Sequence, residues 1–128
     1  MIAFYYIISL KHTLRRDDYI TVWRANDVGY AWPLSWAGKY TEERVLGNLY
    51  YYNGGVSIAV PVEVVDALAV PVTSGKTDGN AGPVVPNTKT AWKKLLASTI
   101  RPPAMTPKPE YPGKRSQTHR QPSTGRAV

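Results

Sequence analysis

The sequence predicts an α+β fold, with a small and mainly antiparallel sheet whose two or three helices pack on one face. Three observations predict it: strand-like segments joined by polar turns fill residues 4–34, a fourth such segment lies at residues 56–60, and the helix-like segments all follow the third strand. The expected element order is βββαβαα in two layers. We place one globular domain at residues 1–100 and a Pro-rich, basic and flexible tail at residues 101–128.

The first strand is expected at residues 4–10, where the side chains alternate between two faces with the period of a strand. One face would carry Phe4, Tyr6, Ile8 and Leu10, and the other Tyr5, Ile7 and Ser9. Because both faces are largely apolar, this strand should lie inside the sheet. The same segment resembles the apolar part of a signal peptide, but no Lys or Arg precedes it and the alternation favours a strand.

The second strand is expected at residues 19–24, which are rich in β-branched and aromatic side chains. Asn, Asp and Gly follow at residues 26–29, and these residues suit a turn. The third strand is expected at residues 30–34. Pro33 has no N–H for a ladder, so this strand should be an edge strand or end there. Residues 35–40 carry no pattern that indicates an element.

A first helix is expected at residues 42–52, with Thr41 as its N-cap and two glutamates in its first turn. A short β-branched segment at residues 56–60, bounded by Gly55 and Pro61, predicts the fourth strand. Pro61 also suits the first position of a second helix, which would end before Pro71.

The last helix is expected to begin after Asn87 or Thr88 and to place its lysines in solvent. Its apolar face would carry Trp92, Leu95, Leu96 and Thr99, and its solvent face Lys89, Lys93 and Lys94. This helix would complete the helical layer.

The net charge of +7 is unevenly distributed. Residues 1–100 contain ten Lys and Arg against eight Asp and Glu, whereas residues 101–128 contain six against one. The tail also holds six of the eleven prolines and only three large apolar residues, so it should bury too little surface to offset the entropy cost of ordering. The absence of cysteine excludes thiolate chemistry and is compatible with a cytoplasmic protein.

Residues 70–88 are expected to form a long loop, of the kind that is usually functional or mobile. Residues 74–77 end like a phosphate-binding loop, but Val70 stands where that motif needs glycine. Residues 78–89 begin like a calcium loop, but Lys89 stands at the final position in place of Glu. We therefore expect no cofactor and no metal. No apolar run approaches the roughly 20 residues that cross a bilayer, so no membrane partner is expected.

The loop between the first two strands contains the candidate chemical groups His12, Arg15 and Arg16, followed by two aspartates. A histidine that moves a proton beside an arginine that holds an anion would suit phosphodiester cleavage. The alternative is a solvated loop whose charges compensate one another. Because such loops are common and the other histidine lies in the tail, we do not expect an enzyme.

Four Trp and nine Tyr against a single Phe indicate half-buried surfaces or binding interfaces. Consecutive tyrosines at residues 50–52 cannot all face one core from a helix, so at least one, with Tyr51 as the candidate, should be exposed. Tyr19 and Trp23 share a sheet face, and an outward orientation would make them a platform for stacking bases. The alternative is an aromatic-rich core with scattered surface tyrosines.

The tail, with Lys114 and Arg115 among its cations, has three possible roles: it neutralises phosphates, it folds onto a protein partner, or it maintains solubility. Together with Lys89, Lys93 and Lys94 of the last helix, it would give a basic surface for DNA or RNA.

Three segments, residues 6–13, 19–24 and 29–40, together with the loop at residues 78–87, resemble small accessory proteins of tailed bacteriophages and prophages. The resemblance covers most of residues 5–96. It implies a binding protein, since many such proteins inhibit a host defence complex by occluding it, and it implies no catalytic residue.

The leading expectation is a non-enzymatic phage accessory protein, in the cytoplasm of an infected bacterium, that binds a host protein or ribonucleoprotein complex of the CRISPR or restriction kind. The alternative is a nucleic-acid-binding protein that uses the basic tail and exposed aromatic residues. A structural virion component is the third possibility. The oligomeric state is left open.

Overall fold

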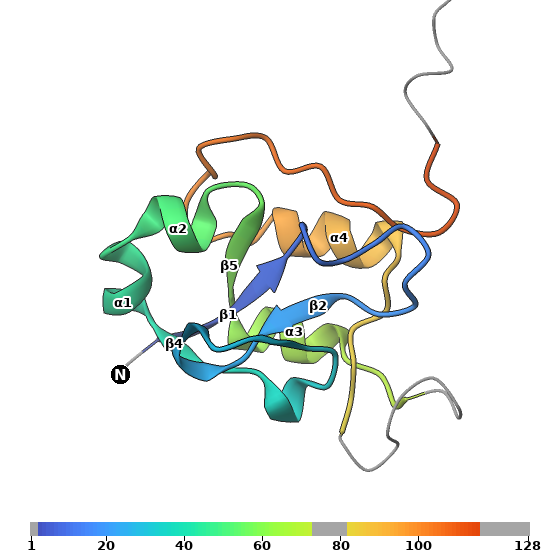
Figure 1. Cartoon of the computed structure of the whole chain (residues 1–128), viewed down its shortest axis with the longest axis horizontal. Helices are drawn as coiled ribbons and strands as arrows, with labels where there is room; N and C mark the ends of the chain where they lie inside the picture. Colours follow the sequence, from blue (N-terminus) through green and yellow to red (C-terminus); the bar gives the residue numbers. More distant parts are fainter. Residues whose placement is uncertain (1–2, 73–81, 116–128) are drawn as a thin grey trace, which may run out of the picture.

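The computed structural model describes residues 3–72 and 82–115, which build a five-stranded antiparallel sheet with helices around it (Figure 1). The sheet contains the strands β1 (Phe4–Ser9), β2 (Thr21–Trp23), β3 (Tyr30–Ala31), β4 (Tyr40–Thr41) and β5 (Ser57–Pro61). The predicted α+β class with a mainly antiparallel sheet is confirmed.

β1 has neighbours along both of its edges. Ile8 lies opposite Val22 of β2 on one edge and opposite Ile58 of β5 on the other. Tyr5 likewise lies between Tyr40 of β4 and Pro61 of β5. β2 and β4 therefore share one edge of β1, end to end, and β5 takes the other edge. The prediction that the first strand is internal is confirmed.

The helical segments are α1 (Glu42–Leu46), α2 (Leu49–Asn53), α3 (Val62–Leu68), α4 (Lys89–Leu96) and the 3-10 turns η1 (Ala25–Asp27) and η2 (Leu34–Trp36). Thr41 and Thr88 are the predicted N-caps, and each side chain accepts a backbone N–H three residues ahead, at 3.2 Å. The predicted helix at residues 42–52 is instead two short helices. The break falls at Gly47 and Asn48, because Asn48 has an extended φ of −153°.

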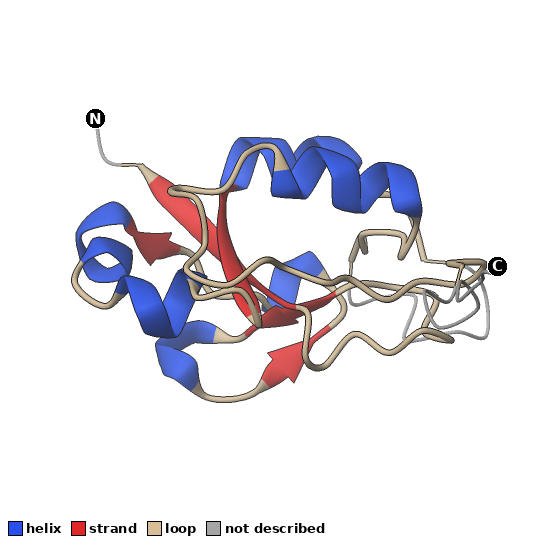
Figure 2. Cartoon of the chain, turned by 90° about the horizontal axis from the view of Figure 1, so that it is seen from above, coloured by secondary structure: helices blue, strands red, loops and turns tan. Residues whose placement is uncertain are grey.

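Helices cover both faces of the sheet, as Figure 2 shows, which corrects the expectation that they collect on one face. One face packs against α3 and α4 in a mainly aliphatic core: Tyr6, Ile8, Leu10, Ile20, Val22, Leu34, Ile58, Val60, Val65, Val85, Ala91, Trp92 and Leu95. The other face packs against α1 and α2 in an aromatic core: Ile7, Trp23, Tyr40, Val45, Tyr52 and Ala59. Since β1 is apolar on both faces, it needs cover on both.

Two predicted strands are shorter than expected, and one strand was not predicted. Tyr19 forms a bridge with Pro86, and Ile20 N–H donates to the carbonyl of Val85, so the start of the predicted second strand pairs outside the sheet. The third strand ends before Pro33, as expected. β4 falls in the segment that carried no recognisable pattern.

The beginning of the predicted tail, residues 101–115, contains no helix or strand but lies against the body (Figure 1, orange). Asn53 connects it to the sheet: Oδ1 accepts the N–H of Ala59 at 3.0 Å and Nδ2 donates to the carbonyl of Arg101 at 2.8 Å. Met105 N–H donates to Gly54 at 2.9 Å, and Tyr111 packs on the aliphatic core. At Ala59 the outer edge of β5 is paired on both backbone groups, since Ile100 N–H also donates to the Ala59 carbonyl at 2.9 Å. An unpaired edge would be open to pairing with another chain.

Candidate functional site

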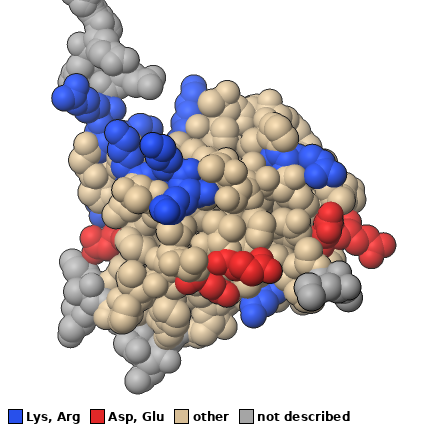
Figure 3. Space-filling model, turned by 180° about the vertical axis from the view of Figure 1, so that it is seen from behind, with Lys and Arg blue, Asp and Glu red and all other residues tan. Residues whose placement is uncertain are grey.

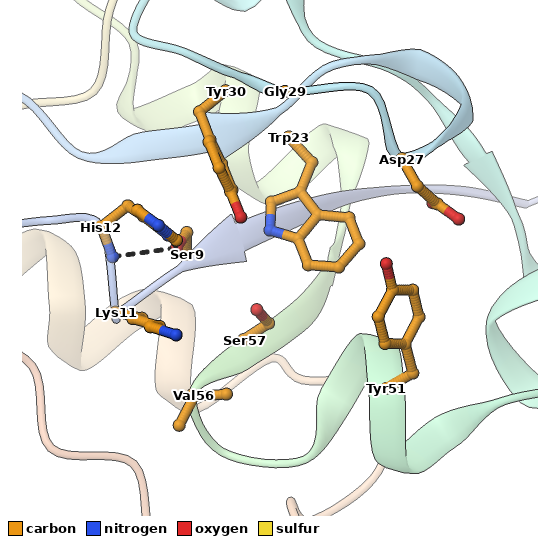
Figure 4. A pocket seen from close by; sticks show the side chains of 10 residues that line it. All are labelled: Ser9, Lys11, His12, Trp23, Asp27, Gly29, Tyr30, Tyr51, Val56 and Ser57. Atoms are coloured by element: carbon orange, nitrogen blue, oxygen red, sulfur yellow. Dashed lines mark hydrogen bonds between the residues drawn. The ribbon is translucent and has the colours of Figure 1, made fainter.

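A cavity of about 220 Å³, the central cavity, opens at the end of β1 on the face that carries the aromatic core (Figure 4). It is lined by Ser9, Lys11, His12, Trp23, Asp27, Gly29, Tyr30, Tyr51, Val56 and Ser57. Gly29 has a φ of +98°, which favours glycine, and this turn brings Tyr30 beside Trp23.

The strand register brings polar side chains to this end of the face. Ser9 lies opposite Ser57 in β5 and opposite Thr21 in β2. Directly opposite residues of antiparallel strands share a face, so these three continue the row that holds Ile7 and Ala59 in the aromatic core. The face therefore changes from apolar to polar where the cavity opens.

His12 is oriented by the turn after β1. Its backbone N–H donates to Ser9 Oγ at 3.0 Å, and its Nδ1 lies 3.1 Å from the same oxygen. Thr13 Oγ1 donates to the Ser9 carbonyl at 2.7 Å and accepts the N–H of Thr21 at 2.9 Å. The imidazole stacks on Tyr30 with a centroid distance of 4.0 Å. The buried Ser9 hydroxyl thus accepts a backbone N–H in the turn and also orients the His12 side chain.

Trp23 forms the inner wall of the central cavity and contacts four tyrosine rings, with centroid distances between 5.2 and 6.4 Å. Its Nε1 is buried, and in the described part of the chain it is the one buried side-chain nitrogen or oxygen without a hydrogen-bond partner. Tyr51 lies across the cavity. Burial, followed by the nearby Asp27 carboxylate, raises the pKa of Tyr51, so its hydroxyl stays neutral.

The stacked pair of His12 and Tyr30 separates the central cavity from an aromatic hollow of about 360 Å³. This hollow is lined by His12, Thr21, Arg24, Tyr30, Ala31, Trp32, Pro33 and Trp36. The guanidinium of Arg24 lies over the Trp36 ring, 4.9 Å from its centroid. A cation therefore lies against an aromatic face in this hollow.

On its other side the central cavity adjoins an apolar hollow of about 640 Å³, with which it shares Lys11 and Val56. The apolar hollow also contains Met105, and it shares Thr106 and Lys108 with a basic hollow of about 480 Å³. The basic hollow is lined by Arg15, Thr106, Pro107, Lys108, Pro109, Glu110, Tyr111, Lys114 and Arg115. We call these four adjoining cavities the groove.

Positive charge predominates along the groove. Its acidic residues are Asp27 and Glu110, and both have cationic neighbours: Arg44 lies 3.3 Å from Asp27, and Lys114 lies 3.5 Å from Glu110. Lys11 and Lys108 are exposed within it. Figure 3, seen from behind the view of Figure 1, shows Lys and Arg gathered over α4 and beside the corner where the described chain ends.

The candidate residues from the sequence fall into three places. His12, Trp23, Tyr51, Arg15, Lys114 and Arg115 all line the groove. Lys89, Lys93 and Lys94 are exposed on α4, as predicted, and Arg16 is exposed on the loop after β1. Arg15, one of the two arginines considered as an anion holder beside His12, instead donates to the Lys114 carbonyl, and its Nε lies 3.8 Å from Glu110 Oε1.

The outward platform of Tyr19 and Trp23 is wrong, because both side chains are buried and Trp23 lies inside the aromatic core. The prediction for the tyrosine triplet is confirmed, since Tyr50 and Tyr51 are exposed while Tyr52 is buried. The exposed aromatic side chains that line the groove are instead Tyr30, Trp36 and Tyr51, and their exposed fractions lie between 44% and 46%.

Sequence reasoning missed the groove residues Ser9, Lys11, Tyr30, Val56, Ser57 and Lys108 as site residues. The available signal was weak: Ser9 and Ser57 interrupt apolar strands, but only the register places them side by side.

Within residues 3–72 and 82–115 no group of three or more potential metal ligands occurs, and no helix there is long and apolar enough to cross a membrane. Residues 74–77 and 78–81 of the loop considered for phosphate or calcium, and the tail beyond residue 115, lie outside the described residues.

Comparisons with known proteins return no match among protein-family models, curated proteins or solved structures.

Proposed function

We propose that this chain is a non-enzymatic binding protein for single-stranded nucleic acid, and that the strand lies in the groove. The observation that carries the proposal is a series of four cavities, each of which shares two lining residues with the next, with aromatic rings at one end and cations at the other. This combination is the one that proteins use to hold single strands, with stacked bases and a neutralised backbone.

The aromatic end supports stacking. Tyr30 and Trp36 present about half of their surfaces to solvent, and Tyr51 does so across the central cavity. A base that stacks on such a ring gains roughly 1–3 kcal/mol. Bases in a duplex have no free face, so this surface favours a single strand.

The basic end supports phosphate neutralisation. Lys11 and Lys108 lie exposed in the middle of the groove, and Arg15, Lys114 and Arg115 line its far end. Because Glu110 offsets part of the charge of Arg15 and Lys114, the middle lysines should contribute most. Binding of this type weakens steeply with salt, with a slope of roughly −0.7 per neutralised phosphate for single strands.

The test is a fluorescence anisotropy titration with labelled single-stranded DNA and RNA of about 16 nucleotides at several salt concentrations. The double variant Lys11→Glu/Lys108→Glu should weaken binding at least about tenfold and flatten the salt slope. The matched control Lys39→Glu/Lys93→Glu makes the same charge change at exposed positions outside the groove and should have a smaller effect.

Two results would contradict the proposal: no binding of any single strand at low salt, or an equal loss in both double variants. The second result would mean that net charge attracts nucleic acid and that the groove has no special part in it.

A protein partner is the second candidate, favoured by the exposed apolar side chains of Val56 and Met105 around the apolar hollow. Tyr, Trp and Met are enriched in protein interfaces. Together with the resemblance to phage accessory proteins, this favours occlusion of a host defence complex. Co-elution with such a complex that survives high salt, and is lost in Val56→Glu, would support this candidate over nucleic acid.

A further inference from the structure

The indole N–H of Trp23 needs an explanation, because buried polar groups in proteins are nearly always paired. The side chain is 7% exposed, and Nε1 has no partner. Two other indoles show the usual arrangement: Trp92 Nε1 donates to Asn87 Oδ1 at 2.6 Å and Trp32 Nε1 donates to Thr21 Oγ1 at 3.2 Å. The missing acceptor for Trp23 is therefore specific to its place in the molecule.

That place is the wall of the central cavity. Figure 4 shows the nitrogen edge of the indole turned into the space between Tyr30 and Ser57. The hydroxyl groups of Tyr30 and Ser57 point into the same space. Three polar groups from β2, β3 and β5 thus converge, and one of them is an unused donor.

The size and walls of the cavity restrict the occupant. A volume of about 220 Å³ is below the roughly 300–1,000 Å³ of pockets that hold drug-sized ligands. The aromatic rings of Trp23, Tyr30 and Tyr51 line it, and such walls suit a flat group. A neutral N–H donor beside two hydroxyl groups suits an uncharged acceptor such as a carbonyl oxygen.

We propose that the central cavity takes one nucleobase, unstacked from the strand in the groove, and that a base carbonyl oxygen accepts the hydrogen bond from Trp23 Nε1–H. This inference rests on the proposed function and adds a base preference to it. Uracil and thymine carry carbonyl oxygens, whereas adenine has none and presents an amino donor beside its ring acceptor. The strand should therefore bind more tightly with uracil or thymine than with adenine.

The first test compares oligo-U and oligo-A of about 16 nucleotides by anisotropy at one salt concentration. One hydrogen bond that is made only with the preferred base predicts about a tenfold preference for oligo-U. Trp23→Phe, which keeps an aromatic ring but removes the N–H, should reduce this preference to about twofold or less. Tyr30→Phe, at a half-exposed position where folding is not at risk, should reduce it partially.

The second test observes the donor directly. In a 15N spectrum the four indole N–H signals are assigned by single Trp→Phe variants, and oligo-U or free uridine is added. The Trp23 signal should shift and its hydrogen exchange should slow, while the Trp92 signal stays unchanged. Adenosine should not reproduce the shift.

The outcomes separate this inference from the function on which it rests. If oligo-U and oligo-A bind equally and the Trp23 signal does not move, the base pocket is wrong and the nucleic-acid groove stands. If no oligonucleotide binds but uridine shifts the Trp23 signal, the groove is wrong and the cavity binds a free nucleoside. If neither oligonucleotide nor uridine affects the Trp23 signal, the inference is overturned.

Discussion

The two faces of the sheet are built from the same strands but differ in whether their buried indole N–H groups have hydrogen-bond acceptors. The face under α3 and α4 is mainly aliphatic, and its indole, Trp92, has a buried hydrogen-bond partner in Asn87. The face beside α1 and α2 is mainly aromatic, and its indole, Trp23, has none. The first face is thus complete in the isolated chain, whereas the second ends in an open cavity with an unused donor. The comparison places the fully paired core on one face and the proposed recognition site on the other.

A matched pair of substitutions, Trp92→Phe and Trp23→Phe, should give the largest difference in stability between the two faces. Trp92→Phe should lower the free energy of unfolding by about 3 kcal/mol, because it loses packing and leaves the buried Asn87 Oδ1 without its donor. Trp23→Phe also loses packing, against its tyrosine neighbours, but it breaks no hydrogen bond and should cost less, about 1–2 kcal/mol. Urea unfolding followed by circular dichroism measures both. Equal losses would remove the distinction between the faces.

The edge where the tail crosses the sheet gives the next largest effect. Asn53→Ala removes the acceptor of the Ala59 N–H and the donor to the Arg101 carbonyl, and should cost about 2 kcal/mol. Asn48→Ala is the matched control, since Asn48 is exposed in the same region and its side chain makes no capping bond. Hydrogen exchange should also become faster across residues 101–115 in Asn53→Ala alone. Unchanged exchange there would show that other contacts hold the segment.

Alkaline pH tests one tyrosine from each face. Burial, together with the Asp66 carboxylate, raises the pKa of Tyr6 to about 12, and burial raises the pKa of Tyr40 to about 12. Both folded pKa values exceed the ordinary value of 10.0, so the stabilisation is present below pH 10 and is lost as the pH rises from about 10 to 12.

Urea midpoints measured across this pH range should therefore fall. Tyr6→Phe and Tyr40→Phe should each remove roughly 1–2 kcal/mol of that fall. A wild-type midpoint that stays constant up to pH 12 would contradict the assignment of both tyrosines as buried and neutral.

The smallest effect is expected at Arg44, on the surface of the aromatic face. Its Nε donates to Tyr52 at 3.0 Å, and its guanidinium lies 5.1 Å from the centroid of the Tyr40 ring. Because the side chain is exposed, Arg44→Ala should cost less than about 1 kcal/mol, and less still in high salt. A cost near that of Trp92→Phe would show that the aromatic face depends on this cation for its stability.

Patterns within a single segment of the sequence correctly predicted a strand, two helix caps and one helix face. The alternation of Phe4–Ser9, the caps at Thr41 and Thr88 and the lysine-bearing face of α4 all agree with the structure. The two-residue strand at Tyr40–Thr41 was missed, since two residues cannot show a period. Of the two alternatives for Trp23, the aromatic-rich core agrees with the structure and the outward platform does not, because α1 and α2 cover that face.

The sequence by itself determined an internal first strand, an α+β class, a basic tail at residues 101–128 and a surplus of Tyr and Trp, because each of these follows from composition or from spacing within one segment. Only the tertiary structure decided that both faces are covered and that Ser9 meets Ser57. It also placed Met105 and Lys108, far along the chain, beside Lys11 and Val56. The groove depends on strand register and on the path of residues 101–115, and contacts between distant segments leave no local pattern to predict them.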